Sequence, residues 1–61
     1  MIKLIKITND GIIYINKNCI VSACAHNYDN SYNTGLTITN GEYIVVKGKL
    51  EDIVKQIEEE K

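Results

Sequence analysis

The sequence predicts a fold of the α+β class that is mainly β, with five short antiparallel strands forming a curled sheet or small open barrel and one C-terminal α-helix. β-branched residues dominate the first 46 positions, and such residues suit a pleated, half-buried surface. Beyond Gly48 the spacing of apolar residues changes from the strand period to the helix period. The expected strands cover 2–8, 12–16, 19–27, 35–39 and 42–47, and the expected helix covers 49–59, within a single domain that spans 1–61.

The first three strands are separated by short polar segments. Asn9-Asp10-Gly11 is a turn signal, because glycine readily adopts the positive φ that a tight turn needs. The strand before this turn and the strand after it are therefore expected to form a hairpin. The third strand is the weakest of the set, because Ala23 and Ala25 are poor strand formers.

Asn40-Gly41 predicts a second hairpin, since Asn-Gly is the strongest short hairpin signal. A type I′ turn needs a positive φ at both central positions, which Asn and Gly tolerate well. In the register that follows, Tyr43 lies on the core face of the sheet. The expected pairs are Thr39 with Glu42, Ile38 with Tyr43, and Leu36 with Val45.

Apolar residues at helical spacing predict that the C-terminal helix docks on the sheet. Gly48 is an acceptable N-cap for this helix. Glu51 and Asp52 lie in the first turn, where the helix dipole favours negative charge. The docking stripe consists of Leu50, Ile53, Val54 and Ile57.

A chain of 61 residues is expected to be marginal as a monomer, because a domain of this size buries only about 60% of the surface of its unfolded chain. Cys19 and Cys24 are too few for a secreted disulfide scaffold, so we expect two reduced thiols in a cytoplasmic protein. Self-association remains as a way to bury more surface, and we therefore expect a homo-oligomer. No stretch approaches the ~20 apolar residues that cross a bilayer, so no membrane insertion is expected.

The charge pattern disfavours a nucleic-acid partner. Residues 1–50 carry five Lys and three acidic residues, whereas residues 51–61 carry two Lys and five acidic residues. Binding to a phosphate backbone needs clustered Lys or Arg, and the sequence contains no Arg. A single-strand binder also needs aromatic platforms along a positive groove, and the sequence has few aromatic residues.

Cys24 and His26 are residue types from which catalytic and metal sites are built, and their spacing places them on one face of a strand. A catalytic dyad would also need an oxyanion hole and an orienting group, which the sequence does not supply. A zinc site needs three or four ligands. We therefore expect no catalytic residue, no metal ligand and no cofactor, in a protein that is not an enzyme.

The segment 28–34 is the longest expected loop, and it contains no aliphatic side chain. Tyr and Asn supply flat faces for stacking and adaptable hydrogen bonds, which suit a partner surface or a planar ligand such as a nucleobase. The alternative is a solvated loop whose composition reflects an AT-rich genome. The candidate ligand-binding residues are His26, Asn27, Tyr28, Asn30, Tyr32 and Asn33.

Segments in both halves of the chain resemble the FlbD family. They are Met1-Ile2-Lys3-Leu4, Gly11 before Ile13-Tyr14-Ile15-Asn16, Ile20, and the run Thr37-Ile38-Thr39-Asn40-Gly41-Glu42-Tyr43-Ile44-Val45-Val46-Lys47 before a short terminal helix. Members of this family are small flagellar or swarming-motility accessory proteins. The resemblance implies a non-catalytic interaction protein of this kind, which would bind its partner through an exposed sheet face and edge strands.

Two other hypotheses remain beside the FlbD-like one. In the first, a homo-oligomer binds or sequesters a small nucleotide-like signal through the 26–34 loop, as a phage-encoded protein could do. In the second, which the charge pattern disfavours, the chain is a weak binder of single-stranded nucleic acid.

Overall fold

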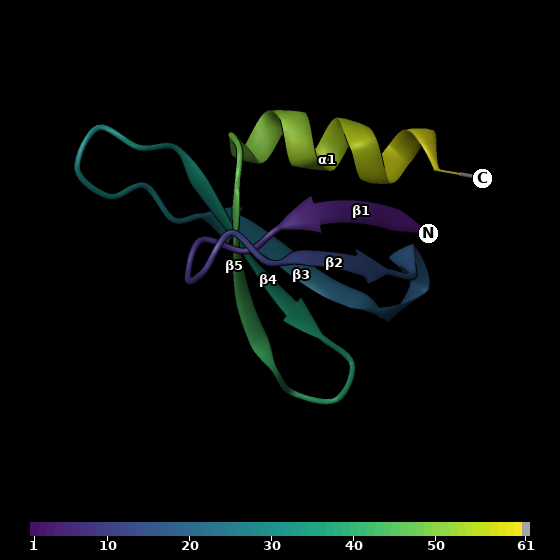
Figure 1. Cartoon of the computed structure of the whole chain (residues 1–61). Coiled ribbons are helices and arrows are strands. Elements are labelled where there is room, and N and C mark those ends of the chain that lie inside the picture. The colour runs from purple at the N-terminus through teal and green to yellow at the C-terminus, as the bar shows by residue number, and fades with distance from the viewer. Residues whose placement is uncertain (61) are drawn as a thin grey trace.

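The computed structural model describes residues 1–60 and contains five antiparallel strands followed by one C-terminal helix (Figure 1). The predicted mainly β fold of the α+β class is therefore confirmed. The strands form two sheets, one of two strands and one of three. The elements are β1 (Ile2–Ile5), β2 (Ile12–Ile15), a short 3-10 helix η1 (Lys17–Cys19), β3 (Ile20–Ala25), β4 (Asn33–Ile38), β5 (Tyr43–Lys47) and α1 (Leu50–Glu59).

The chain that follows β1 joins the two sheets. Lys6 forms a single antiparallel bridge with Val46, and the amide of Ile7 donates to the carbonyl of Val45 at 3.2 Å. This single bridge brings the end of β1 beside β5, but the two sheets, with strand orders β1-β2 and β3-β4-β5, stay separate and do not close into a barrel. The predicted strand 2–8 was too long, because β1 ends at Ile5 and the next residues cross to β5.

The core lies between the inner faces of the two sheets and α1. Strand alternation sends Ile2 and Leu4 inward and leaves Lys3 and Ile5 exposed. The predicted docking stripe of α1 faces the core, with Ile53 buried and the other three residues half-buried. Gln56 Nε2 donates to the carbonyl of Lys3 at 3.1 Å and holds the helix beside β1 (Figure 1). The buried apolar residues are Ile2, Leu4, Leu36, Val46 and Ile53.

The start of α1 differs from the prediction by one residue. Lys49, not Gly48, is the N-cap, and its side chain makes no capping hydrogen bond. Gly48 precedes the helix with a φ of 123°, a conformation that glycine tolerates best. Its carbonyl accepts a hydrogen bond at 3.0 Å from the hydroxyl of Thr34, which is fully buried. This contact ties the beginning of the helix to β4.

The predicted register of β4 and β5 is wrong by one residue. The amide of Gly41 donates to the carbonyl of Ile38 at 2.8 Å, and the amide of Ile38 donates to the carbonyl of Glu42 at 2.9 Å. Gly41 has a positive φ of 91°, but Asn40 does not have a positive φ. The loop therefore has three residues, as in a type I turn followed by a bulge, and is not a type I′ turn.

This one-residue shift exchanges the inner and outer faces of β5. Thr37 pairs with Tyr43 and Leu36 pairs with Ile44. Because a one-residue slip sends each side chain to the opposite face, Ile44 and Val46 point inward while Tyr43 lies on the outer face. The prediction that Tyr43 packs in the core is wrong.

The segment predicted as a long loop is the end of the β3–β4 hairpin. Tyr28 and Ser31 exchange two backbone hydrogen bonds of 3.0 and 2.8 Å. Between them, Asp29 and Asn30 have φ values of 48° and 60°, which is the geometry of a type I′ turn. The amide of His26 also donates to the carbonyl of Asn33 at 2.9 Å. The hairpin end projects from the body of the protein, as Figure 1 shows.

Candidate functional site

The outer face of the three-stranded sheet carries a cluster of polar side chains around Tyr43. The hydroxyl of Tyr43 lies 3.2 Å from His26 Nδ1 and 3.6 Å from Cys24 Sγ. The Tyr43 ring crosses Gly35 of β4, where an added Cβ would collide with the hydroxyl. The absence of a side chain at Gly35 therefore allows Tyr43 to reach Cys24 of β3 and His26 just after it.

Contact with Cys24 raises the pKa of Tyr43 above its ordinary value of 10.0. The largest cause is the hydrogen bond to the Cys24 sulfur, which holds the phenolic proton. Loss of solvent around the ring and the charge of the sulfur act in the same direction. Because the raised pKa belongs to the folded state, this contact stabilises the fold below pH 10.0 and is lost as the pH rises through the folded-state pKa.

Replacing Cys24 by Ala is expected to return the pKa of Tyr43 toward its ordinary value. An ultraviolet titration of tyrosinate formation measures this change, and subtraction of the matching Tyr43→Phe titration isolates the signal of Tyr43. As a control, Cys19→Ala removes the other thiol, which makes no hydrogen bond to Tyr43 within residues 1–60, and should leave the titration unchanged. Equal curves for the Cys24→Ala variant and the unsubstituted protein would contradict the contact.

The cluster does not pair the thiol of Cys24 with the imidazole of His26. Cys24 Sγ and His26 Nδ1 each contact the Tyr43 hydroxyl, and within residues 1–60 they form no hydrogen bond with each other. No group of three or more His, Cys, Asp or Glu that could hold a metal ion occurs among residues 1–60. Both cysteines are free thiols. That the protein is not an enzyme stays a prediction.

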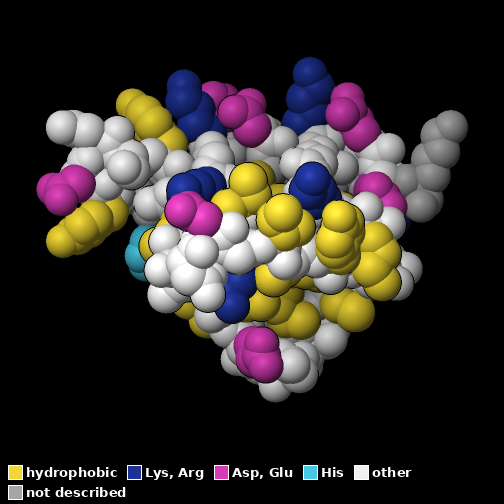
Figure 2. Space-filling model, in the orientation of Figure 1, with side chains coloured by type: hydrophobic (Ala, Val, Ile, Leu, Met, Phe, Trp, Pro, Cys, Tyr) yellow, Lys and Arg dark blue, Asp and Glu magenta, His cyan; other side chains and the backbone are white. Residues whose placement is uncertain are grey.

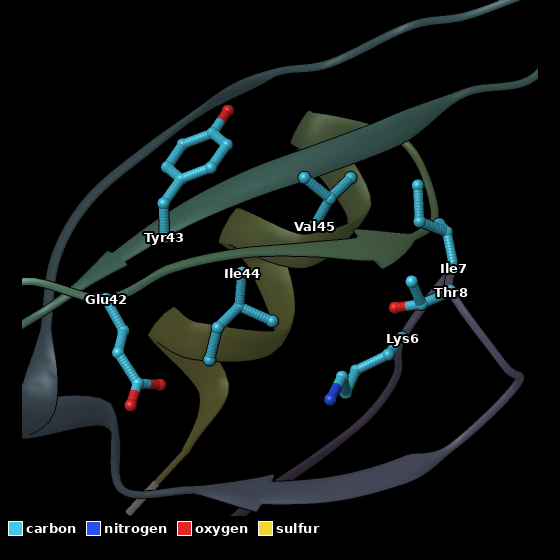
Figure 3. Close-up of a pocket in the computed structure, with 7 residues that line it drawn as sticks. All are labelled: Lys6, Ile7, Thr8, Glu42, Tyr43, Ile44 and Val45. Carbon is cyan, nitrogen blue, oxygen red and sulfur yellow. The ribbon is translucent and has the colours of Figure 1, made fainter.

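A second feature is a cavity of about 380 Å³ beside β5, which is lined by residues from both faces of that strand and which we call the β5 groove. In Figure 3, Tyr43 and Val45 project to one side of β5, whereas Ile44 and Glu42 project to the other. The groove lies between β5 and the connection from β1 to β2. Its lining residues are Lys6, Ile7, Thr8, Glu42, Tyr43, Ile44 and Val45.

The largest cavity of the three, about 540 Å³, lies under the projecting hairpin and is called the hairpin cleft. It brings together His26, Tyr28 and Asn33 of the candidate ligand-binding residues. Lys47 and Ile7 complete its wall, and Lys47 forms an ion pair with Asp10. Asp29 and Ser31 also line it.

The other candidate residues lie elsewhere. Asn27 and Tyr32 line a cavity of about 320 Å³ next to the start of α1. There Lys49 Nζ lies 4.9 Å from the centroid of the Tyr32 ring, a cation–π contact. Asn30 sits in the turn and lines none of these three cavities. The six candidates are divided because neighbouring residues of a hairpin alternate between its two faces.

Sequence reasoning missed Tyr43, Lys47 and Ile7 as residues of the outer face. A two-residue turn in the β4–β5 hairpin predicts Tyr43 on the core face, whereas the three-residue loop places Tyr43 and Lys47 on the outer face. Ile7 was assigned to a continuous first strand, and no local signal marks its crossing to β5. A three-residue β4–β5 loop is enough to place Tyr43 and Lys47 on the outer face.

Exposed apolar side chains gather on the outer face of β1 and β2. Ile5 lies directly opposite Ile12, so the two share this face, and strand alternation adds Tyr14. Ile7 continues the group toward β5. Figure 2 shows hydrophobic side chains grouped on this side of the molecule. We call Ile5, Ile7, Ile12 and Tyr14 the apolar patch; each is at least 40% exposed.

Among the described residues, no helix is long and apolar enough to cross a membrane. Comparison with protein-family models, with curated proteins and with solved structures finds no match to this chain.

Proposed function

We propose that this protein is a non-catalytic interaction protein that acts in the cytoplasm and binds a protein partner through the apolar patch. The observation that carries the proposal is the gathering of four exposed apolar side chains on one face. Single exposed apolar residues are normal on a protein surface, but a contiguous group is typical of an interaction site. Lys3 lies directly opposite Tyr14 in the β1–β2 ladder and supplies a charged neighbour of the kind found at the rim of interface cores.

The resemblance to the FlbD family supports a partner in the flagellar or swarming apparatus. The segments that carry the resemblance include β1, β2 and β5 with their turns, and the patch lies on the first two of these strands and, through Ile7, on the connection between them. A motility accessory of this kind needs no reactive group. It needs a stable fold that presents one surface to its partner.

Deletion of the gene from a flagellated source bacterium is expected to reduce swimming or swarming. The unsubstituted gene should restore motility, and the double variant Ile5→Lys/Ile7→Lys should not, because two charges would be buried at the partner interface. Val21→Lys is the control, since Val21 is exposed and lies outside the patch. Motility on soft agar is measured after circular dichroism has shown that both variants fold.

Unchanged motility after deletion would remove the flagellar role. Full restoration by the double variant would show that the patch is not the binding surface.

A second candidate function is the binding of a small nucleotide-like ligand in the hairpin cleft of a homo-oligomer. The observation that favours it is the chemistry of the cleft, where Tyr28 offers a ring for stacking and Lys47 offers a cation that a phosphate would share with Asp10. The volume of about 540 Å³ falls within the range usual for ligand pockets.

A nucleotide that binds this cleft is expected to raise the melting temperature. A ligand at 100 times its dissociation constant stabilises the native state by about 2.7 kcal/mol. Thermal unfolding against a panel of mononucleotides and cyclic nucleotides measures the shift, and Tyr28→Ala should abolish it. Tyr32→Ala is the matched control, because Tyr32 lies on the other side of the hairpin. A panel without any shift would count against this function.

A further inference from the structure

One long side of β2 is unpaired. The amide of Lys6 donates to the carbonyl of Gly11 at 2.8 Å, which fixes the phase of the β1–β2 ladder. Residues of antiparallel strands alternate in the direction of their backbone groups, so Gly11, Ile13 and Ile15 face β1. The amides and carbonyls of Ile12 and Tyr14 therefore face away from β1, and within residues 1–60 β2 pairs with β1 alone.

This edge lacks the features that keep edge strands apart. Natural edges carry Lys, Pro or a bulge, whereas β2 reads Ile-Ile-Tyr-Ile and is paired without a register shift. Its outward side chains are the most exposed members of the apolar patch, with Ile12 at 56% and Tyr14 at 62% exposure. An uncharged, exposed edge of this kind is a template for another strand.

We propose that two copies of this chain associate by antiparallel pairing of their β2 strands about Ile13. Ile12 of each copy then lies opposite Tyr14 of the other, and each such pair exchanges two backbone hydrogen bonds. Both unpaired residues of β2 are satisfied in this register, and every bonded residue lies inside the strand. The result is a four-stranded sheet with the order β1-β2-β2-β1.

The side chains agree with this register. Ile12 and Tyr14 share the outer face, so the pairing joins the apolar patches of both copies into one surface. Ile13 meets the Ile13 of the second copy on the inner face. A slip by one residue would set outward side chains against inward ones, which disfavours it.

Charges at the two ends of β2 favour a second copy in the antiparallel direction. Asp10 precedes the strand and Lys17 follows it. Antiparallel pairing about Ile13 brings Asp10 of one copy toward Lys17 of the other at both ends of the interface; within its own copy Asp10 pairs with Lys47, and Lys17 Nζ donates to the carbonyl of Glu60. A parallel arrangement would align like charges instead, which is destabilising.

The area that such a dimer needs is within reach of this surface. A stable interface buries about 600 Å² or more per partner, roughly one seventh of the 4295 Å² that the chain exposes. The hairpin of β1 and β2 supplies the edge and the four side chains of the patch. The core holds only five buried apolar residues in the described chain, so added burial would stabilise a domain of this size.

The dimer does not depend on the proposed function, because it concerns the strand edge and not the partner. Sedimentation equilibrium of the full chain over a wide concentration range is expected to give twice the mass of 6.9 kDa. Tyr14→Lys should weaken the dimer by about tenfold or more, because the charge faces Ile12 of the other copy. Val21→Lys, an exposed valine on β3, is the control and should leave the mass unchanged.

A charge pair tests the register. The double variant Ile12→Lys/Tyr14→Glu places opposite charges against each other across the two-fold axis and should restore the dimer that Ile12→Lys alone weakens. Circular dichroism confirms that each variant folds, as expected for exposed positions. A protein that stays monomeric at all concentrations overturns the proposal. The proposal is also overturned if Tyr14→Lys and Val21→Lys weaken the oligomer equally. It is overturned as well if the Ile12→Lys/Tyr14→Glu dimer dissociates as readily as the Ile12→Lys dimer.

Discussion

Replacing Val46 by Ala is expected to lower the free energy of unfolding by about 2 kcal/mol or more, because the change removes two buried methyl groups and leaves a cavity. Val46 is 0% exposed and lies on β5 where the bridge from Lys6 joins the two sheets. A domain of this size has a total stability of about 3–9 kcal/mol. The substitution would therefore remove a large share of it.

Val21→Ala is the matched control for this experiment. The same two methyl groups are removed, but Val21 is 63% exposed, so we expect a change below about 0.5 kcal/mol. Urea unfolding followed by circular dichroism gives both values, with the midpoint as the measure and the slope as the check on two-state behaviour. Equal losses in the two variants would contradict the assignment of Val46 to the inner face.

Replacing Gly35 by Ala is expected to have opposite effects in two backgrounds. In the unsubstituted protein the new Cβ collides with the Tyr43 ring and drives it from its contacts with Cys24 and His26, which should cost about 1 kcal/mol. In a Tyr43→Ala background the collision is gone. The same substitution should then be neutral or stabilising by about 0.5 kcal/mol, because glycine in a strand loses more conformational entropy on folding than alanine.

The unsubstituted protein, Gly35→Ala, Tyr43→Ala and the double variant form a double-mutant cycle. The free energies of unfolding of all four, measured in urea, give the coupling energy between positions 35 and 43. The cycle also tests the register. With Tyr43 on the core face, as the two-residue turn requires, Gly35 and Tyr43 would not share a face and their effects would add. A coupling near zero would therefore favour the two-residue turn over the three-residue loop.

In the β4–β5 hairpin the sequence predicts the position of the chain reversal but not the length of the loop. Asn40-Gly41 places the reversal correctly, because few other residues turn a chain so tightly. It does not choose between a two-residue and a three-residue loop, since Gly41 fits both. Both faces of β5 carry apolar residues, so the hydrophobic pattern does not choose either. The three-residue loop is compatible with Gly35, four residues before Thr39, whose missing side chain leaves room for the Tyr43 ring.

The division of the candidate site has a similar cause. Asp29-Asn30 forms a turn because Asp and Asn tolerate a positive φ, but the pair is a weaker signal than Asn-Gly. Once the segment is a hairpin, alternation separates Asn27 from His26 and Tyr28 without further assumptions. Ile7 is a harder case. Its place depends on the backbone of Val45, a contact between residues far apart in the sequence that no short pattern encodes.

Ile7 lines both the hairpin cleft and the β5 groove, so the two cavities share one side chain in their walls. A molecule that presses Ile7 aside in one compartment alters the volume of the other. The free energies of occupying the two compartments are then linked, and the linkage must be reciprocal. Replacing Ile7 by alanine shortens the one side chain that both cavities share, so it should weaken their linkage while leaving each cavity its other walls.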